Sequence, residues 1–382
     1  MESIVVLGSG LAGYTVVREL RKLDGDIAVT LLSRDDGDFY SKPMLSNAYA
    51  QRKDATGLVQ TPAAQMARQL GIQLRSRCEV NAIDATNKRL HTSHGVLAYD
   101  RLVLAAGADP IRIPLQGDAA DAVLSVNDIA DYARFRAAMQ GVKHIAIMGG
   151  GLIGCEFAND LAAAGVAVSV IDPGAYPLAS LMPELAGTQL VQPFAALGVD
   201  WRFGVSVSRV DAAPAGYALT LSDGSRLQTG LVLSAVGLRP RTGLAKAAGL
   251  AVNRGIVVDA KLRSSERDIY ALGDCAEIDG RVLPFVLPIM HAARALAKTL
   301  AGDETPAAFP VMPVVVKTPA HPVAVLPVAR DAAGEWCTLA NGNGVKMAFM
   351  DAAGRIGGFA LTGEYAAERN EMAKLAIVPG QG

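Results

Sequence analysis

Apolar runs separated by glycine-rich turns and amphipathic stretches recur in the same order at two places in the chain. Each place has an apolar run, a turn of glycines, a helical pattern and a second apolar run. Continuous apolar runs are typical of parallel strands that are buried on both faces. The sequence therefore predicts two copies of a strand–helix–strand unit. The apolar runs cover residues 3–7 and 27–32 in the first copy and 145–148 and 166–171 in the second, with helices to about residues 23 and 164.

Three further apolar stretches end in glycine or proline and indicate where the chain changes domain. Residues 96–105 lead into Gly107–Pro110, residues 231–236 lead into Gly237–Pro240, and residues 269–272 lead into Gly273 and Asp274. From residue 310 onward the chain is rich in proline and in β-type stretches. We therefore expect an α/β protein with a discontinuous first domain (1–112 and 241–309), an inserted second domain (113–240) and a small C-terminal α+β domain (310–382).

The two glycine-rich turns fit the fingerprint of a dinucleotide-binding loop. The first glycine permits a tight turn, the second lets the backbone approach a pyrophosphate, and the third lets the helix pack on the strand. The helix N-terminus then directs its positive end toward the phosphates. The loops consist of Gly8, Gly10, Leu11, Ala12 and Gly13 in the first copy, and Gly149, Gly151, Leu152, Ile153 and Gly154 in the second.

An acidic residue follows the second strand of each copy. A carboxylate at this position accepts hydrogen bonds from ribose hydroxyls. Asp172 would also repel the additional phosphate of NADPH, and residues 173–177 offer no arginine to bind that phosphate. We therefore expect NADH at the second fingerprint. The role of Asp35 is less defined, because Ser33, Asp36 and Asp38 lie in the same loop.

Composition narrows the class of protein. With 382 residues, of which 51% are hydrophobic and 19% charged, the chain is a globular protein of more than one domain. A net charge of −1 and dispersed basic residues argue against nucleic-acid binding. We find neither a signal peptide nor an uninterrupted apolar run of about 18 residues, so we expect a cytoplasmic protein without membrane insertion. The cysteines, whose spacing fits neither zinc nor disulfides, are expected to be free thiols: Cys78, Cys155, Cys275 and Cys337.

Several stretches of the chain are similar to the two-dinucleotide-domain flavoprotein reductases, and among these to the NADH-dependent rubredoxin reductases of bacterial alkane oxidation. The resemblance covers nearly the whole chain. It implies two Rossmann-like domains, the first for FAD and the inserted second for NAD, with FAD as cofactor and NADH as substrate. The stretches that carry it include GSGLAGY, YSKPMLS, LVLAAGADPIR, GLIGCEFANDL, SAVGLRPRT, IYALGDCAE and VKTPAHP.

The resemblance also implies roles for individual residues. Asp274 matches an aspartate that binds the FAD ribityl chain, and Lys42 matches a basic residue near the isoalloxazine. Glu156 matches a glutamate near the flavin and the nicotinamide, so Lys42 and Glu156 are the candidate catalytic residues. The further FAD residues are the first fingerprint with Ser33, Arg34, Asp35, Val80, Ala106, Gly107, Val286 (just before a helix whose N-terminus approaches the flavin) and Lys317. The further NAD residues are the second fingerprint with Asp172 and Gly237.

The chain departs from the family pattern at one position near the flavin. Many ferredoxin-type relatives carry a lysine where this chain has Asn47. Glu156 therefore either pairs with Lys42 or has no lysine partner. His321 receives no role and is expected to be a packed or surface histidine.

The absence of cysteine before Cys78 indicates how electrons leave. Without a thiol near the first fingerprint, the flavin has to pass electrons directly to an external carrier, and the resemblance implies rubredoxin. The alternatives are an NADH–ferredoxin reductase of an oxygenase system and a slow-turnover flavin redox sensor. A monomer is compatible with the sequence, and the oligomeric state is left open. Because rubredoxins are acidic, a basic rim is expected, and its candidates could equally form an ordinary solvated face: Arg18, Arg21, Lys22, Arg52 and Lys53.

Overall fold

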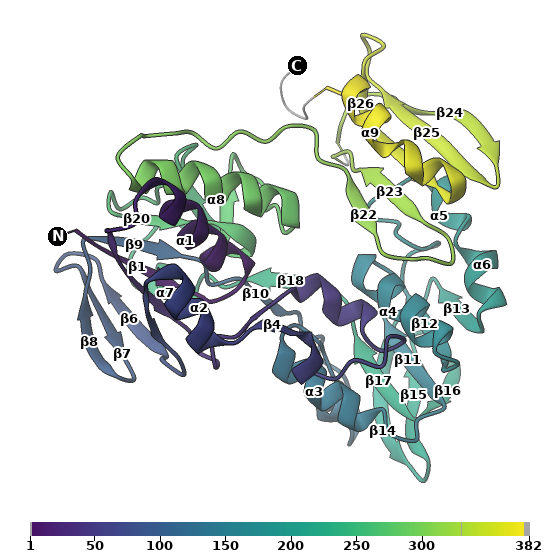
Figure 1. Cartoon of the computed structure of the whole chain (residues 1–382). Helices are drawn as coiled ribbons and strands as arrows, with labels where there is room; N and C mark the ends of the chain where they lie inside the picture. The colour runs from purple at the N-terminus through teal and green to yellow at the C-terminus, as the bar shows by residue number, and fades with distance from the viewer. Residues whose placement is uncertain (1, 330, 378–382) are drawn as a thin grey trace. The chain divides into compact units, whose positions relative to one another are not determined.

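The computed structural model describes residues 2–329 and 331–377, and these residues divide into two compact units (Figure 1). Unit 1 contains the residues up to Lys42 together with Val59–Asp109 and Leu238–Phe309, and unit 2 contains Pro43–Leu58, Pro110–Gly237 and the residues from Pro310 on. The chain leaves unit 1 after Asp109 and returns at Leu238, near the expected limits at residues 112 and 241, but it also leaves after Lys42 and returns at Val59, inside the expected first stretch. The three-domain division stays a prediction, and its limits at residues 1 and 382 lie outside the described residues.

Unit 1 is built on a parallel sheet with the strand order β20-β9-β1-β2-β5. Ile4 of β1 pairs with Val29 of β2 on one side and Arg101 of β9 on the other. The apolar run of β1 is buried as expected, because Ile4, Val5 and Val6 are each 1% exposed. Helices α1 and α8 pack together in this unit. The bounds are β1 Ser3–Leu7, α1 Leu11–Leu23, β2 Ala28–Leu32, β5 Gln73–Arg75, β9 Arg101–Leu104, β20 Ile269–Ala271 and α8 Val286–Leu300.

Shorter elements complete unit 1. An antiparallel sheet runs in the order β6-β7-β8, β19 pairs with β21 in parallel, and β3 pairs with β4. The strands β10 and β18 pair where the chain passes between the units. The bounds are β3 Phe39–Tyr40, β4 Val59–Thr61, α2 Ala63–Leu70, β6 Val80–Asp84, β7 Arg89–Thr92, β8 Gly95–Ala98, β10 Ala108–Pro110, β18 Leu238–Pro240, α7 Gly243–Ala247, β19 Ile256–Val258, η4 Gly273–Cys275 and β21 Ala276–Ile278.

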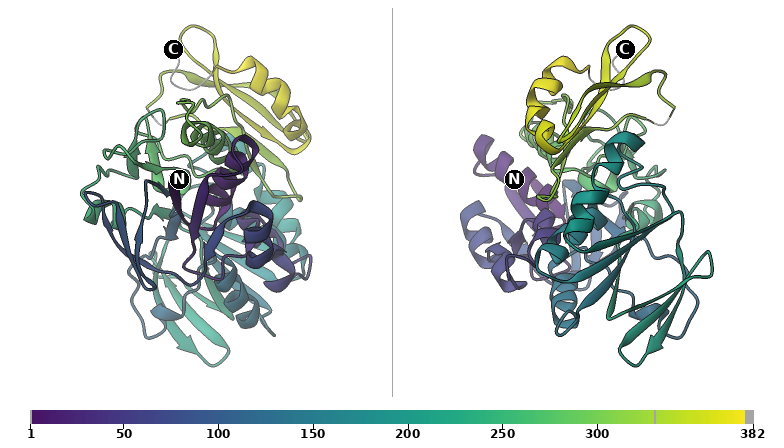
Figure 2. Two further views of the ribbon diagram at one scale, coloured as in Figure 1. Left: turned by 60° about the vertical axis from the view of Figure 1, so that its left-hand side comes forward. Right: turned by 90° about the vertical axis from the view of Figure 1, so that its right-hand side faces the viewer.

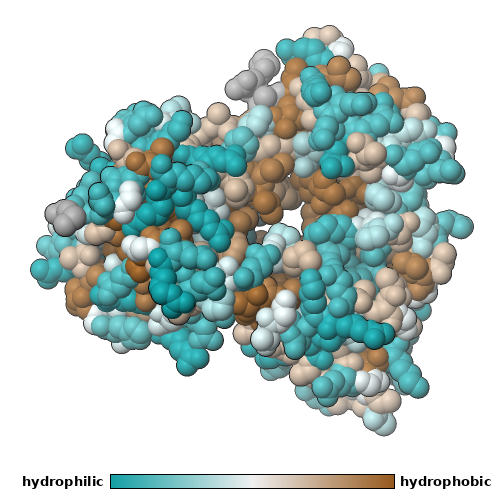
Figure 3. All heavy atoms as spheres, viewed as in Figure 1, coloured by the Kyte–Doolittle hydropathy of each residue, from teal (hydrophilic) through white to brown (hydrophobic). Residues whose placement is uncertain are grey.

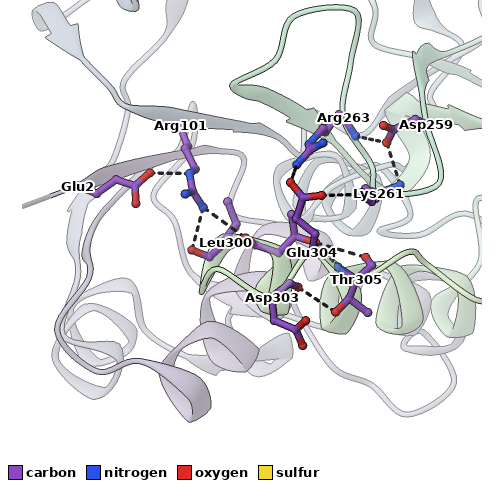
Figure 4. Close-up of polar contacts among 10 residues, drawn as sticks. Glu2, Arg101, Asp259, Lys261, Arg263, Leu300, Asp303, Glu304 and Thr305 are labelled. Carbon is purple, nitrogen blue, oxygen red and sulfur yellow. Dashed lines mark hydrogen bonds and ion pairs between the residues drawn. The ribbon is translucent and has the colours of Figure 1, made fainter.

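Hydrogen bonds from an arginine hold the C-terminal end of α8, and ion pairs follow just beyond it (Figure 4). The Arg101 guanidinium donates to the carbonyl oxygens of Thr299 and Leu300 at 3.3 and 3.0 Å, which satisfies acceptors that a helix end leaves free. Beyond the helix, Glu304 forms ion pairs with Lys261 and Arg263. The strand that starts at Arg101 and the end of α8 are thereby held together.

Unit 2 contains the second parallel sheet, with the strand order β13-β12-β11-β17. Helix α4 packs on β11 and β12, and the antiparallel sheet β14-β15-β16 completes the inserted stretch. This arrangement confirms the expected α/β class with two Rossmann-like parts. The bounds are η1 Lys42–Asn47, η2 Thr56–Leu58, α3 Ile129–Ala138, β11 His144–Met148, α4 Leu152–Ala163, β12 Ala167–Asp172, α5 Glu184–Thr188, α6 Val191–Ala196, β13 Val199–Phe203, β14 Val207–Ala213, β15 Gly216–Leu221, β16 Arg226–Thr229 and β17 Leu231–Ser234.

The C-terminal stretch forms a sheet with the order β22-β23-β26-β25-β24, whose neighbouring strands are antiparallel. Helix α9 contacts β23 and β26 and lies against this sheet in both views of Figure 2. The expected α+β character is therefore observed. The bounds are β22 Val314–Val316, β23 Val323–Leu326, β24 Glu335–Gly342, β25 Gly344–Met350, β26 Ile356–Thr362, η5 Gly363–Glu368 and α9 Arg369–Leu375.

Hydrophilic residues cover much of the face drawn in Figure 3, and hydrophobic residues appear there in separate patches. No helix within residues 2–329 and 331–377 is both long and apolar enough to cross a bilayer. Within the same ranges, no group of His, Cys, Asp or Glu side chains is arranged to hold a metal ion. All cysteines are free thiols, of which Cys78, Cys155 and Cys275 are buried.

Candidate functional site

The glycines of the first fingerprint meet two different demands. Gly8 has φ +118°, and a β-carbon there would lie 2.2 Å from the carbonyl oxygen of Ala105. A β-carbon at Gly13 would lie 1.9 Å from the carbonyl oxygen of Gly8. Gly10, by contrast, has no atom within 4 Å of its β-position. It occupies the N-cap position of α1, where no side chain accepts a hydrogen bond from the first N–H groups of the helix. The turn therefore leaves open space and an uncapped helix N-terminus at Gly10, which is the arrangement that a pyrophosphate fits.

The second fingerprint repeats this construction in unit 2. Gly149 has φ +103°, and a β-carbon there would lie 2.7 Å from the Ala235 carbonyl oxygen. A β-carbon at Gly154 would lie 1.9 Å from the Gly149 carbonyl oxygen, whereas Gly151 faces open space and caps α4 without a side-chain bond. Each unit thus carries one site that is shaped for a dinucleotide.

The carboxyl ends of β9 and β20 lead into further FAD candidates of unit 1, Ala106 and Gly107 after β9 and Asp274 after β20. A β-carbon at Gly273 would lie 3.0 Å from the Ala12 side chain, so η4 packs directly on the start of α1. Next to Gly273, the Asp274 carboxylate lies 3.8 Å from the Lys42 ammonium. Ligands of open α/β sheets bind outside the carboxyl ends of the strands. The structure therefore brings Lys42 and Asp274 together where the sequence placed the flavin.

Arg241 is a residue of this region that the sequence reasoning missed. Its guanidinium donates to the carbonyl oxygen of Ala106 at 2.8 Å and to the carboxylate of Asp109 at 2.7 Å. Burial acts to raise the pKa of Asp109, but the Arg241 hydrogen bond and the charges of Arg241, Arg34 and Lys42 hold it below its usual range. A cluster of positive charge thus accompanies the Ala106–Gly107 turn, which suits a ligand with phosphates.

The loop after β2 uses its polar groups mainly on itself. Ser33 donates to an oxygen of Asp35, which also accepts the backbone N–H of Gly37 at 2.9 Å, and the hydroxyls of Ser9 and Ser33 lie 2.6 Å apart. Asp35 therefore shapes this loop, and its ribose role stays a prediction. Val80 is buried in β6, and Val286 is the first residue of α8, 41% exposed, where the sequence placed it just before the helix.

Asp172 is anchored to the second fingerprint from the end of β12. One carboxylate oxygen accepts the N–H of Gly150 at 2.5 Å, and the other accepts the N–H of Gly174 at 2.6 Å. Each oxygen keeps a lone pair for a further donor. Gly237 has φ +114°, and its carbonyl oxygen accepts the N–H of Ile111 at 3.0 Å. This hydrogen bond joins the two ends of the inserted stretch 110–237.

A buried ion pair lies on α4, two residues beyond its last fingerprint glycine. Glu156 is fully buried, and one of its oxygens accepts the Lys317 ammonium at 2.5 Å and the Ser46 hydroxyl at 2.6 Å. Its other oxygen accepts the backbone N–H of Lys317 at 3.0 Å. Both sequence alternatives for Glu156 are therefore wrong: its lysine partner is Lys317, and Lys42 lies by Asp274. The resemblance places Lys317 at FAD, and nothing in the sequence pattern connects it with α4.

Two more polar side chains on α4 were missed. Asn159 and Asp160 are 4% and 5% exposed, on a helix whose residues from Gly154 to Ala162 are all buried. Burial raises the pKa of Asp160 to about 6, against the opposing effect of backbone hydrogen bonds from Tyr49 and Ala50. A helix that is apolar on all sides except for Glu156, Asn159 and Asp160 was the signal in the sequence, because buried polar groups require partners.

The proposed basic rim is used partly for packing within unit 1. Arg18 lies 4.0 Å above the ring of Phe39, and Arg21 donates to the carbonyl oxygen of Leu70 at 2.6 Å. Lys22 is paired with Glu19. Arg18 and Arg21 are thus held by contacts within unit 1, and the basic rim stays a prediction.

His321 is a packed histidine. It is 7% exposed, its backbone N–H donates to Thr318, and burial lowers its pKa.

Comparisons with known proteins identify relatives of the chain in sequence and in fold. A model of the pyridine nucleotide-disulphide oxidoreductase family matches residues 2–298, and a model described as the rubredoxin binding C-terminal domain matches residues 306–376. The chain is 49% identical to the rubredoxin-NAD(+) reductase of Alcanivorax borkumensis, over 99% of this chain and 100% of that protein. It is 40% identical to the protein of the same name from Acinetobacter baylyi, over 100% of both chains. The crystal structure of a ferredoxin reductase from Rhodopseudomonas palustris shares the fold, with a TM-score of 0.89, 24% identity, and coverage of 99% of this chain and 96% of that one.

Proposed function

The chain belongs to the pyridine nucleotide-disulphide oxidoreductase family, and we propose that it is a flavoprotein reductase that transfers electrons from NADH through FAD to rubredoxin. The observation that carries the acceptor is the match of residues 306–376 to a rubredoxin binding domain. It is supported by 49% and 40% identity to rubredoxin-NAD(+) reductases along the whole chain. We further propose that the protein works in the cytoplasm and supplies alkane hydroxylation.

FAD and NADH supply the redox chemistry: the flavin takes two electrons together from the nicotinamide and can release them singly. The protein contributes binding and electrostatics. The N-terminus of α1 and the space at Gly10 receive the FAD pyrophosphate, and Asp274 is the acceptor for the ribityl chain. The N-terminus of α4 and the space at Gly151 receive NADH, whose ribose hydroxyls donate to Asp172. The other assigned residues, Lys317 at FAD among them, stay predictions from the resemblance.

The charge at Asp172 supports NADH over NADPH. Both carboxylate oxygens are fixed by backbone N–H groups, so the negative charge cannot turn away from a bound coenzyme. A 2′-phosphate at the ribose would meet that charge at close range, which costs energy.

The burial of the cysteine thiols supports direct release of electrons from the flavin to the acceptor. Cys78, Cys155 and Cys275 are buried, and burial raises the pKa of Cys155 and of Cys275 (to about 11), so neither is a reactive thiolate near neutral pH. A one-electron carrier therefore takes electrons without a thiol relay. Such encounters use small interfaces of less than about 1,200 Å².

Stopped-flow reoxidation distinguishes the proposed acceptor from its alternatives. The protein is reduced with one equivalent of NADH and mixed with rubredoxin or with ferredoxin, and flavin absorbance is followed. We expect rubredoxin to reoxidise the flavin at least about tenfold faster than ferredoxin. A faster reaction with ferredoxin would support the ferredoxin-reductase alternative, and slow reoxidation by both carriers would support a redox sensor.

A further inference from the structure

The buried polar side chains of α4 hold two segments that are distant in sequence. Asp160 accepts the N–H of Tyr49 at 2.8 Å and that of Ala50 at 3.3 Å, one on each carboxylate oxygen. Asn159 accepts the N–H of Ala320 at 3.0 Å. Glu156 holds Lys317 through its backbone and its side chain. One helix thus fixes the stretch 43–58 and the stretch 317–320 in the same unit.

The hydrogen bonds of the Lys317 ammonium connect the stretch 317–320 with the stretch 43–58. It donates to Glu156, to the carbonyl oxygen of Pro43 at 2.5 Å and to the hydroxyl of Ser46 at 3.1 Å. Two of these acceptors therefore come from the stretch 43–58. The side chain of Asn47 adds a hydrogen bond to the Lys317 carbonyl oxygen at 3.2 Å. The position of the cation is consequently set by how the stretch 43–58 is held on α4.

We propose that Asp160 is a positioning residue, which holds the stretch 43–58 through the amides of Tyr49 and Ala50 and thereby directs Pro43 and Ser46 at the Lys317 ammonium. This role rests on the proposed function, because Lys317 matters to the reaction only if the protein is such a reductase. Asp160 itself contacts neither Glu156 nor Lys317 through a hydrogen bond, so it acts through the loop.

The role requires a carboxylate. Each oxygen of Asp160 receives one amide, whereas an asparagine has only one acceptor oxygen and would turn an NH₂ group toward the other amide. The charged and titratable groups that face Asp160 are Arg136 and Lys317, which act to lower its pKa, and Tyr132. Arg136 also lies 4.5 Å above the ring of Tyr49. Burial raises the pKa of Asp160, and Arg136 and Lys317 oppose this rise together with the amides of Tyr49 and Ala50.

The test compares Asp160→Asn with Asp223→Asn in the FAD-loaded protein. Asp223 is a matched control, because it also accepts a backbone N–H, that of Ser225 at 2.9 Å, in an exposed turn of the same unit. Two readouts are independent of turnover: hydrogen exchange of the amides of Tyr49 and Ala50, and the rate at which an amine-acylating reagent modifies Lys317, followed by mass spectrometry. The third readout is kcat and KM for NADH with rubredoxin.

In Asp160→Asn, the amide hydrogens of Tyr49 and Ala50 should exchange about tenfold faster than in wild type, because a hydrogen bond to a charged acceptor is lost. Lys317 should be acylated several-fold faster and kcat should fall several-fold at constant KM, while Asp223→Asn changes none of these. Exchange and acylation rates equal to those of wild type would overturn the proposal. If wild type fails to reduce rubredoxin, the proposed function fails, whereas the exchange and acylation rates still decide the role of Asp160.

A measurement on the unmodified protein covers the case in which Asp160→Asn does not fold. The pKa of Asp160 is about 6. Exchange at Tyr49 and Ala50, corrected for the intrinsic pH dependence, should therefore accelerate between pH 7 and pH 5. A constant corrected rate would overturn the positioning role of Asp160.

Discussion

Removal of the cation of the α4 ion pair tests the arrangement at Glu156 most directly. Lys317→Met keeps the length of the side chain but leaves a buried carboxylate without its cation. Breaking a buried pair in this way costs about 3–5 kcal/mol, and we expect about 3 kcal/mol because the Lys317 side chain is 32% exposed while that of Glu156 is 1% exposed. Glu156→Gln should cost about 2 kcal/mol, since its amide keeps part of the hydrogen bonding. In the double variant the two costs should not add, and the coupling energy should reach about 2 kcal/mol.

The assay is urea unfolding followed by tryptophan fluorescence. Trp201 and Trp336 both lie in unit 2, and the chain has two tryptophans, so the signal reports the unit that contains the ion pair. The matched control is Lys346→Met, which removes a cation 2.6 Å from Glu368 in the same unit. It should cost at most about 1 kcal/mol, because the Glu368 side chain is 35% exposed and water can solvate its charge. If Lys317→Met costs no more than Lys346→Met, the buried pair does not stabilise unit 2 as we argue.

Three further outcomes are expected. Asp172→Ala should narrow the preference for NADH over NADPH in kcat/KM about tenfold, and an unchanged ratio would argue against its ribose role. As apoproteins, Gly13→Ala should melt at a lower temperature than wild type and Gly10→Ala should not, because a β-carbon would lie 1.9 Å from the Gly8 carbonyl oxygen in the first and would have no atom within 4 Å in the second. When purified with its cofactor, Gly10→Ala should instead show reduced flavin absorbance. Burial raises the pKa of Asp160 from 3.8 to about 6, so between these pH values the folded state binds more protons than the unfolded state. From pH 7 to pH 5 the free energy of unfolding of wild type should therefore rise by about 1 kcal/mol relative to that of Asp160→Asn. Urea midpoints of the two proteins that change in parallel with pH would contradict this.

The strands and helices of the two nucleotide-binding parts could be predicted because their signals are local. The apolar run at residues 3–7 became β1 with the same bounds, and the helix expected to end near residue 23 is α1. The fingerprint glycines could be recognised from their spacing alone, since each is required by a turn or by a close approach of two segments. Local physics therefore defined the architecture and both fingerprints.

The partner of Glu156 could not be predicted in this way. Lys317 is 161 residues away, and no periodicity or spacing relates the two positions. The resemblance pointed instead to Lys42, which is also distant from Glu156 in the sequence and belongs to a different unit of the fold. Arg18 and Arg21 show the same limit, because their use as packing and hydrogen-bonding groups depends on Phe39 and Leu70, which only the tertiary structure brings to them.

The assembly of unit 2 from three separated stretches has a consequence for biosynthesis. Ser46 meets Glu156 across 110 residues, and Pro43 meets Lys317 across 274 residues. Contacts between positions so distant in sequence form slowly, and domains fold only when their parts have left the ribosome. The stretch 43–58 therefore emerges long before α4, and α4 emerges long before Lys317. A nascent chain shorter than 317 residues lacks the cation that pairs with Glu156, so the ion pair of unit 2 forms only after Lys317 has been synthesised.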